Sequence, residues 1–150
     1  MVDLQAGREE KLREAIELFY FAYRAFTDGA DHILEERGLG RVHHRILYFV
    51  GRNPGSSVNA LLEILDVSKQ ALHAPLRQLV EAGLVVMQAD EKDRRFKRLS
   101  LTSEGKKLEA RLTGAQMKLL SAVFTATGDR TQAAWKTVML EMSQRAGIKS

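Results

Sequence analysis

The sequence predicts a mainly α-helical fold with a small β-hairpin, on the basis of three observations. Apolar residues recur at spacings of three and four along most of the chain, which is the period of an amphipathic helix. Glycine and proline residues interrupt this pattern and divide it into separate helices. Between residues 84 and 101 the period changes, and two short segments flank a charged loop, which is typical of a hairpin.

The composition is that of a globular protein with one hydrophobic core. Of the 150 residues, 45% are hydrophobic and 28% are charged, and the longest apolar runs, Leu18–Tyr23 and Ile46–Val50, are too short to span a bilayer. We expect a single domain over residues 1–150, located in the cytoplasm because the N-terminus does not resemble a secretory signal. The sequence has no cysteine, which excludes disulfides and thiol redox sensing.

Two helices are expected before the first proline. The first covers about residues 9–37 and carries an apolar stripe rich in aromatic side chains. The stripe is formed by Leu12, Ile16, Phe19, Tyr23 and Phe26. The second helix covers residues 41–52 and ends at Asn53-Pro54-Gly55, because proline cannot continue the helical hydrogen-bond ladder.

Two shorter helices then follow in quick succession. Ser57 is the candidate N-cap of a helix over residues 58–65, and Ser68 is the candidate N-cap of a helix that runs to about Ala82. Gly83 stands where a left-handed residue is expected to end that helix. Two helices joined by a turn of three or four residues form a helix-turn-helix, whose second helix enters the major groove of DNA.

The exposed side of this second helix carries side chains suited to nucleic acid. Glutamine pairs well with adenine, and lysine or arginine with guanine or phosphate. The free N–H groups at the helix N-terminus also favour an anion such as a phosphate. The candidate DNA contacts on this helix are Ser68, Lys69, Gln70, His73 and Arg77.

A charged hairpin follows the helix-turn-helix, with strands expected over residues 84–88 and 96–101. An arginine-bearing loop beside a major-groove helix is well placed to enter a minor groove, whose negative potential attracts arginine. Residues 67–101 hold seven basic and four acidic side chains, whereas residues 1–40 hold five basic and nine acidic ones. The candidate DNA contacts on the hairpin are Lys92, Arg94, Arg95 and Lys97.

Two long helices are expected to complete the chain, over residues 103–126 and 131–146. Both are too apolar for solvated arms, as is the first helix, and we therefore expect them to pair with a second copy of the chain. Pro75 departs from the general pattern because it lies inside the second helix of the helix-turn-helix, where it removes a backbone donor. We expect either a bend there or a helix that lies differently in the groove.

Two segments of the chain, residues 57–85 and 90–105, resemble the MarR (multiple antibiotic resistance regulator) family. Residues 57–85 are similar to the family's helix-turn-helix with its closing Gly-Leu-Val, and residues 90–105 are similar to its wing. The residues that match the wing pattern are Asp90, Asp93, Arg94, Arg95, Leu101, Thr102 and Gly105. The resemblance implies a winged helix-turn-helix lobe over residues 41–101, flanked by dimerisation helices over residues 1–40 and 102–150.

The resemblance also implies a function and a set of roles. The chain would be a transcriptional regulator that binds a pseudo-palindromic operator as a homodimer, with Arg94 and Arg95 inserted into DNA and Asp93 orienting one of them. Members of the family bind small effectors, often phenolic acids, in a crevice between the dimer arm and the DNA-binding lobe, and the effector releases the DNA. The candidate lining residues for a small aromatic or amphipathic effector are Tyr20, His44, Arg45 and Tyr48.

The sequence leaves one alternative function open and argues against two others. A winged-helix module that binds another protein and not DNA would present the same exposed helix, and it is the alternative. The adjacent His43 and His44 point about 100° apart on a helix and cannot easily chelate one ion, so neither a metal nor a cofactor is expected. The sequence has no Gly-rich phosphate loop and no paired-carboxylate or nucleophile motif, which argues against an enzyme.

Overall fold

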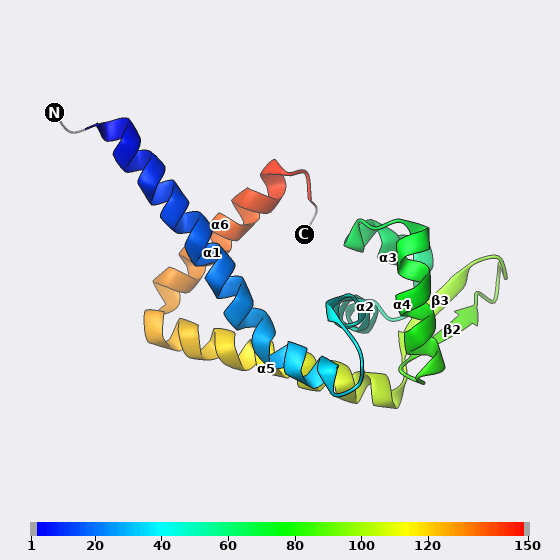
Figure 1. The fold of residues 1–150 in the computed structure, drawn as a ribbon. Helices are drawn as coiled ribbons and strands as arrows, with labels where there is room; N and C mark the ends of the chain where they lie inside the picture. Colours follow the sequence, from blue (N-terminus) through cyan, green and yellow to red (C-terminus); the bar gives the residue numbers. More distant parts are fainter. Residues whose placement is uncertain (1–2, 149–150) are drawn as a thin grey trace.

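The computed structural model describes residues 3–148, and these form a mainly helical fold with a small antiparallel sheet (Figure 1). The helices are α1 (Leu4–Glu35), α2 (Arg41–Arg52), α3 (Val58–Leu65), α4 (Lys69–Glu81), α5 (Ser103–Thr127) and α6 (Asp129–Arg145). The strands are β1 (Ser56–Ser57), β2 (Val85–Ala89) and β3 (Lys97–Leu101). The predicted fold class is therefore confirmed. Among the described residues, no helix combines the length and apolar character that crossing a membrane requires.

Side-chain caps begin several of the helices, and the sequence predicted those at Ser57 and Ser68. The hydroxyl oxygens of Ser57, Ser68 and Thr102 accept the N–H groups three residues ahead, at 3.0–3.1 Å, and so begin α3, α4 and α5. The first helix begins earlier than expected, because the Asp3 carboxylate accepts the N–H of Gln5 at 3.0 Å and caps it. Gly83 has a φ of 74° and ends α4 as predicted.

The sheet contains one strand that the sequence did not indicate. Its order is β1-β3-β2, and both pairings are antiparallel. Ser56 pairs with Leu99, and Ser57 pairs with Arg98, so the hairpin of β2 and β3 gains a third strand from the turn before α3. A strand of two serines has no alternation to detect, which is why the sequence predicted only a hairpin.

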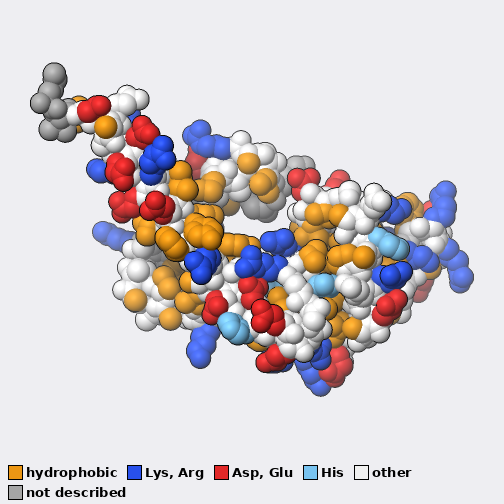
Figure 2. Space-filling view, in the orientation of Figure 1, with side chains coloured by type: hydrophobic (Ala, Val, Ile, Leu, Met, Phe, Trp, Pro, Cys, Tyr) orange, Lys and Arg blue, Asp and Glu red, His pale blue; other side chains and the backbone are white. Residues whose placement is uncertain are grey.

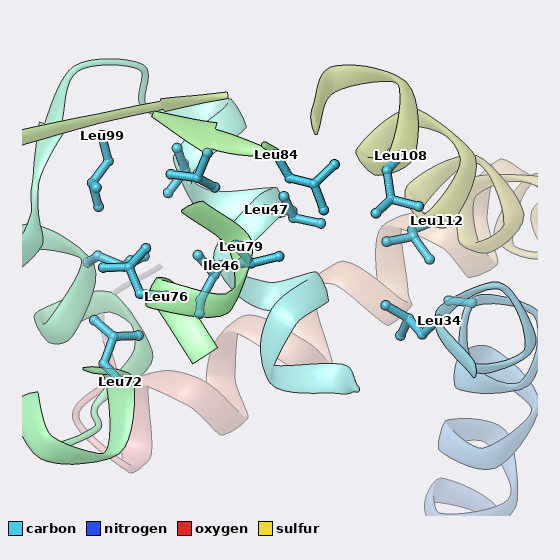
Figure 3. Packing of buried hydrophobic residues seen from close by; sticks show 14 residues of the cluster. Leu34, Ile46, Leu47, Leu72, Leu76, Leu79, Leu84, Leu99, Leu108 and Leu112 are labelled. Carbon is cyan, nitrogen blue, oxygen red and sulfur yellow. The ribbon is translucent and has the colours of Figure 1, made fainter. Parts of the chain in front are cut away.

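The core is a leucine-rich cluster that joins the helix-turn-helix to the long helices (Figure 3). At one end of the cluster, Leu72 and Leu76 of α4 lie near Leu99 of the sheet. At the other end, Leu34 of α1 packs beside the α5 residues Leu108 and Leu112. Ile46 and Leu47 of α2 lie between the two ends. Helix α2 therefore connects α4 and the sheet to the long helices α1 and α5.

The wing is joined to α5 by a close contact at a glycine. The Thr102 hydroxyl donates to the Gly83 carbonyl at 2.6 Å, and the Thr102 N–H donates to the Leu84 carbonyl at 3.1 Å. A Cβ atom at Gly105 would overlap the backbone carbonyl of Leu84. The Leu-Thr-x-x-Gly pattern therefore holds the end of the hairpin against the start of α5.

The N-terminal part of α1 extends away from the rest of the protomer (Figure 1). Every residue from Asp3 to Ala25 is exposed in the described protomer. Apolar side chains gather on this part of α1 and on α6 behind it (Figure 2). The exposed apolar residues of these two helices include Leu12, Ile16, Leu18, Phe19, Tyr20, Phe21, Tyr23, Trp135, Val138 and Met142.

Candidate nucleic-acid interface

The exposed face of α4 holds all five side chains that the sequence proposed for this helix. Leu72, Leu76 and Leu79 are buried, and their spacing turns one side of the helix toward the core. The opposite side is exposed to solvent. It carries Lys69, Gln70, His73 and Arg77, with Ser68 at its N-terminal end.

Two of these side chains already have partners within the chain. The Ser68 hydroxyl oxygen accepts the Ala71 N–H at 3.0 Å, which leaves the hydroxyl hydrogen free to donate to a phosphate. The Arg77 guanidinium lies 3.6 Å from the Glu81 carboxylate, and both side chains are well exposed. Such a surface pair is weak, so Glu81 offers little competition to a DNA phosphate.

The helix continues through Pro75 from Lys69 to Glu81. Proline has no N–H, so the Ala71 carbonyl lacks its partner four residues ahead. Ala71 is exposed, and water can satisfy that carbonyl. The helix is thus continuous through the proline with one ladder hydrogen bond fewer, and buried leucines lie on both sides of it, at Leu72 and Leu76.

In the loop between β2 and β3, Arg95 forms a bidentate ion pair with Asp93. The Asp93 carboxylate accepts from Nε of Arg95 at 3.0 Å and from its Nη2 at 2.7 Å. It also accepts the Arg95 N–H at 3.1 Å. This pairing lowers the pKa of the Asp93 carboxyl group and raises the pKa of the Arg95 guanidinium. Asp93 thus orients Arg95, and Arg94 makes no ion pair with any described residue.

A second pair braces the base of the loop. The Asp90 carboxylate accepts the Asp93 N–H at 3.1 Å and the Nε of Arg98 at 3.3 Å. Arg98 also donates to the Gly55 carbonyl at 3.4 Å, in the turn before β1. Arg98 therefore connects the wing to the turn before β1.

Side chains of α4 and the wing line the same cleft, which has a volume of about 360 Å³. Lys69 and His73 come from α4, and Arg95 and Lys97 come from the wing. Figure 1 shows why, since α4 runs beside the hairpin and the loop extends beyond it. Lysine and arginine side chains gather at this end of the molecule (Figure 2).

The same cleft contains residues that the sequence did not single out. Phe96 is 46% exposed and Met87 is 37% exposed, and both lie in its apolar wall with Leu72 and Leu76. Asn59 of α3 lies at its edge. An exposed phenylalanine directly after an arginine pair was visible in the sequence, but nothing there indicated that it would face α4.

A second cavity, of about 350 Å³, lies where α1, α2 and α5 meet. His44, Arg45 and Tyr48 line it as expected. Tyr20 does not line the cavity, which corrects that part of the prediction. It lies about one helical turn before Tyr23, nearer the N-terminus of α1, and is 58% exposed. Tyr23 lies in the cavity wall instead. The other lining residues are Phe26, Thr27, Ala30, Asp31, Arg41, Phe49, Thr113, Gln116, Met117 and Leu120.

The polar groups of this cavity differ in how far they are neutralised. The Arg41 guanidinium binds the Asp31 carboxylate at 2.8–3.2 Å, so its charge is balanced. The Arg45 guanidinium donates to the uncharged hydroxyl of Tyr23 at 3.3 Å. His44 Nε2 lies 3.3 Å from the Thr113 hydroxyl, and burial lowers the pKa of this histidine, which favours its neutral form.

Comparison with known proteins agrees with this geometry. A model described as the MarR family matches residues 37–95. The HTH-type transcriptional regulator PetP of Rhodobacter capsulatus is 39% identical over 138 residues, which cover 92% of this chain and 83% of PetP. The chain belongs to the MarR family. This MarR-family protein is thus a DNA-binding transcriptional regulator and not an enzyme.

Solved structures show the same fold. A crystal structure of a MarR family transcription regulator superposes with a TM-score of 0.80 at 18% identity, covering 97% of this chain and 96% of the other. The S. aureus MepR–DNA complex superposes with a TM-score of 0.71 at 20% identity, covering 86% of this chain and 96% of MepR. The family assignment favours the DNA-binding hypothesis over a module that binds only protein.

Proposed function

We propose that this MarR-family protein binds a pseudo-palindromic DNA site as a homodimer. Each protomer places α4 in a major groove, with Lys69, Gln70, His73 and Arg77 facing the DNA, and its wing arginines in a neighbouring minor groove. The observation that carries this proposal is the shared cleft, because Lys69 of α4 lines it together with Arg95 and Lys97 of the wing. In this proposal, residues 41–101 form the DNA-binding lobe, and the protein acts in the cytoplasm.

The exposed apolar surface of the arms supports the dimer. Residues 15–23 of α1 are apolar on nearly every side of the helix, and a helix of that kind is normally buried. In the protomer this stretch is exposed, and none of the described residues of α6 is buried. Residues 1–40 and 102–150 of a second copy offer a matching apolar surface, as a two-fold interface requires.

Selection from a random DNA pool tests the function directly. Sequencing of the duplexes that the protein retains should give an inverted repeat, with half-site centres about 10 base pairs or a multiple of that apart. Affinity for the selected duplex should decrease steeply as salt increases, because lysine and arginine release counterions from phosphates. A single half-site, or no enrichment at low salt, would contradict the proposal.

We also propose that a small aromatic carboxylate binds in the cavity between α1, α2 and α5 and releases the DNA. The cavity walls are mostly apolar, and Arg45 has an uncharged partner there, whereas Arg41 is neutralised by Asp31. Salicylate should therefore bind and salicylamide should not, as measured by calorimetry.

The matched variants for this effector site are Arg45→Met and Arg24→Met. The first should weaken salicylate binding about tenfold or more, because a charge-assisted hydrogen bond is lost. The second changes an arginine of α1 that does not line the cavity and should leave binding unchanged. Equal binding of salicylate and its amide would contradict the assignment of Arg45 as the carboxylate partner.

A further inference from the structure

Two adjacent histidines of α2 contact different parts of the molecule. His43 and His44 are each only 8% exposed. His43 Nε2 lies 2.7 Å from Oε1 of Gln78 on α4, whereas His44 Nε2 lies near Thr113 on α5. Figure 1 shows α2 between these two helices. His43 therefore makes a polar contact between α2 and α4.

The hydrogen bonds of His43 define which ring nitrogen carries the proton. Nδ1 accepts the Gly40 N–H at 2.9 Å, so Nδ1 is unprotonated. The neutral ring then carries its hydrogen on Nε2, which donates to the Gln78 side chain at 2.7 Å. Both nitrogens are satisfied, and the ring is held between the N-terminus of α2 and the side of α4.

The hydrogen bond between His43 and Gln78 constrains α4 in a way that its leucine contacts do not. Leu72, Leu76 and Leu79 hold α4 against the core, but apolar contacts tolerate small rotations and shifts of a helix along its neighbour. A short hydrogen bond has a preferred direction and resists both. Gln78 also lies in the half of α4 that follows Pro75, where the ladder to the N-terminal half has lost one bond.

We propose that His43 is a positioning residue for DNA recognition. Through Gln78 it sets the rotation of α4 about its own axis, and so it aims Gln70, His73 and Arg77 at the bases. The inference rests on the proposed function, because it assumes that α4 enters the major groove. It predicts that loss of the bond weakens binding to the cognate site much more than binding to unrelated DNA, which depends mainly on charge.

The experiment compares affinity for the selected duplex and for a scrambled duplex of equal length, by fluorescence anisotropy. Gln78→Ala changes an exposed side chain and should lower the free energy of unfolding only by the loss of one hydrogen bond. It should weaken binding to the selected duplex about tenfold and to the scrambled duplex less than twofold. His43→Leu should weaken binding to the two duplexes in the same proportion, and it should also destabilise the fold because the Gly40 N–H loses its acceptor. The double variant should be no weaker than the worse single variant, because both single changes remove the same bond between His43 and Gln78.

His43→Gln provides the conservative rescue, since its side-chain amide can donate to Gln78 from a position near that of Nε2. It should recover most of the affinity that His43→Leu loses. Equal losses for both duplexes, additive effects in the double variant, or a loss confined to Gln78→Ala would each overturn the proposal. The last outcome would make Gln78 a direct DNA contact. Failure of the wild type to prefer the selected duplex would instead refute the proposed function.

Discussion

At the scale of single residues, neighbouring arginines in the wing have different tasks. Arg95 is held by Asp93 in a bidentate pair, whereas Arg94 is exposed and makes no ion pair among the described residues. A guanidinium that is already oriented loses less side-chain entropy when it enters a groove. Asp93 would then assist binding although its own charge repels phosphate.

The first prediction concerns this pair. Arg95→Ala should weaken binding to the selected duplex by about 1–3 kcal/mol, if Arg95 contacts base edges in a groove. Asp93→Asn should also weaken it, even though this change makes the protein more positive. Binding isotherms at two salt concentrations measure both effects. Tighter binding by Asp93→Asn would show that Asp93 acts only through repulsion.

The second prediction is a pH dependence of stability that originates at His44. Burial lowers its pKa in the folded state, so the unfolded chain takes up a proton more readily. The stability that the neutral ring provides is complete above the ordinary pKa of about 6.5 and is lost as the pH falls through the lower folded value. Thermal unfolding at pH 7.5 and 5.5 should therefore differ less in His44→Gln than in the wild type.

His32 provides the control for this measurement. It lies on the surface of α1, and its contacts with Asp28 raise its pKa, whereas burial lowers the pKa of His44. His32→Gln should therefore leave the loss of stability at pH 5.5 intact or slightly larger. If stability falls less between pH 7.5 and 5.5 in His32→Gln than in His44→Gln, the pH dependence does not originate at His44.

At the scale of helices and strands, local signals predicted most of the fold. The bounds of α2 and α3 agree with the sequence, because Pro54 and Ser57 act through their own backbone and side chain. Contacts between distant segments were not predictable in this way. The pairing of β1 with β3 and the place of Tyr23 in the cavity between α1, α2 and α5 depend on how elements meet in three dimensions.

The same limit applies to α4 and to the candidate site. The sequence identified the exposed cations of α4 from helical period, and the structure places them on its outer face. It did not identify the cleft wall at Phe96, or the bond from His43 to Gln78. The sequence predicts either a bend at Pro75 or a different placement of α4 in the groove. The structure shows that α4 is continuous through Pro75, with Leu72 and Leu76 buried on either side, and the placement in the groove stays a prediction.

The third prediction tests the joint between the wing and α5. Gly105→Ala forces a Cβ atom against the Leu84 carbonyl, so the backbone must move, and we expect destabilisation by about 1–3 kcal/mol. Gly114→Ala is the matched control in the same helix, where an added Cβ meets nothing within 4 Å. It should stabilise α5 by up to about 1 kcal/mol. Urea unfolding measures both, and equal effects would contradict the packing argument.

At the scale of the whole molecule, the protomer consists of a compact lobe and long arms with exposed apolar surface. The leucine cluster joins them through α2, and the contact of Thr102 with Gly83 and Leu84 joins them a second time at the start of α5. The apolar stretch of α1 between residues 15 and 23 is the part of the protomer that most needs a covering partner.

The fourth prediction is therefore that the arms control the oligomeric state. Phe19→Asp places a charge in the apolar stretch and should yield monomers by light scattering at micromolar concentration, together with loss of binding to the selected duplex. Ile64→Asp is the control, because Ile64 is a comparably exposed apolar residue on α3 outside the arms. A dimeric Phe19→Asp variant would contradict the proposed interface.

The exposed stretch of α1 has a consequence for gene dosage. If two chains must dimerise before they bind an operator, the fraction of operator that is occupied at low abundance rises with the square of the number of chains in the cell. A modest change in synthesis or degradation then produces a disproportionate change in transcription. The aromatic side chains of one helix would thereby give the promoter a threshold, without any ligand.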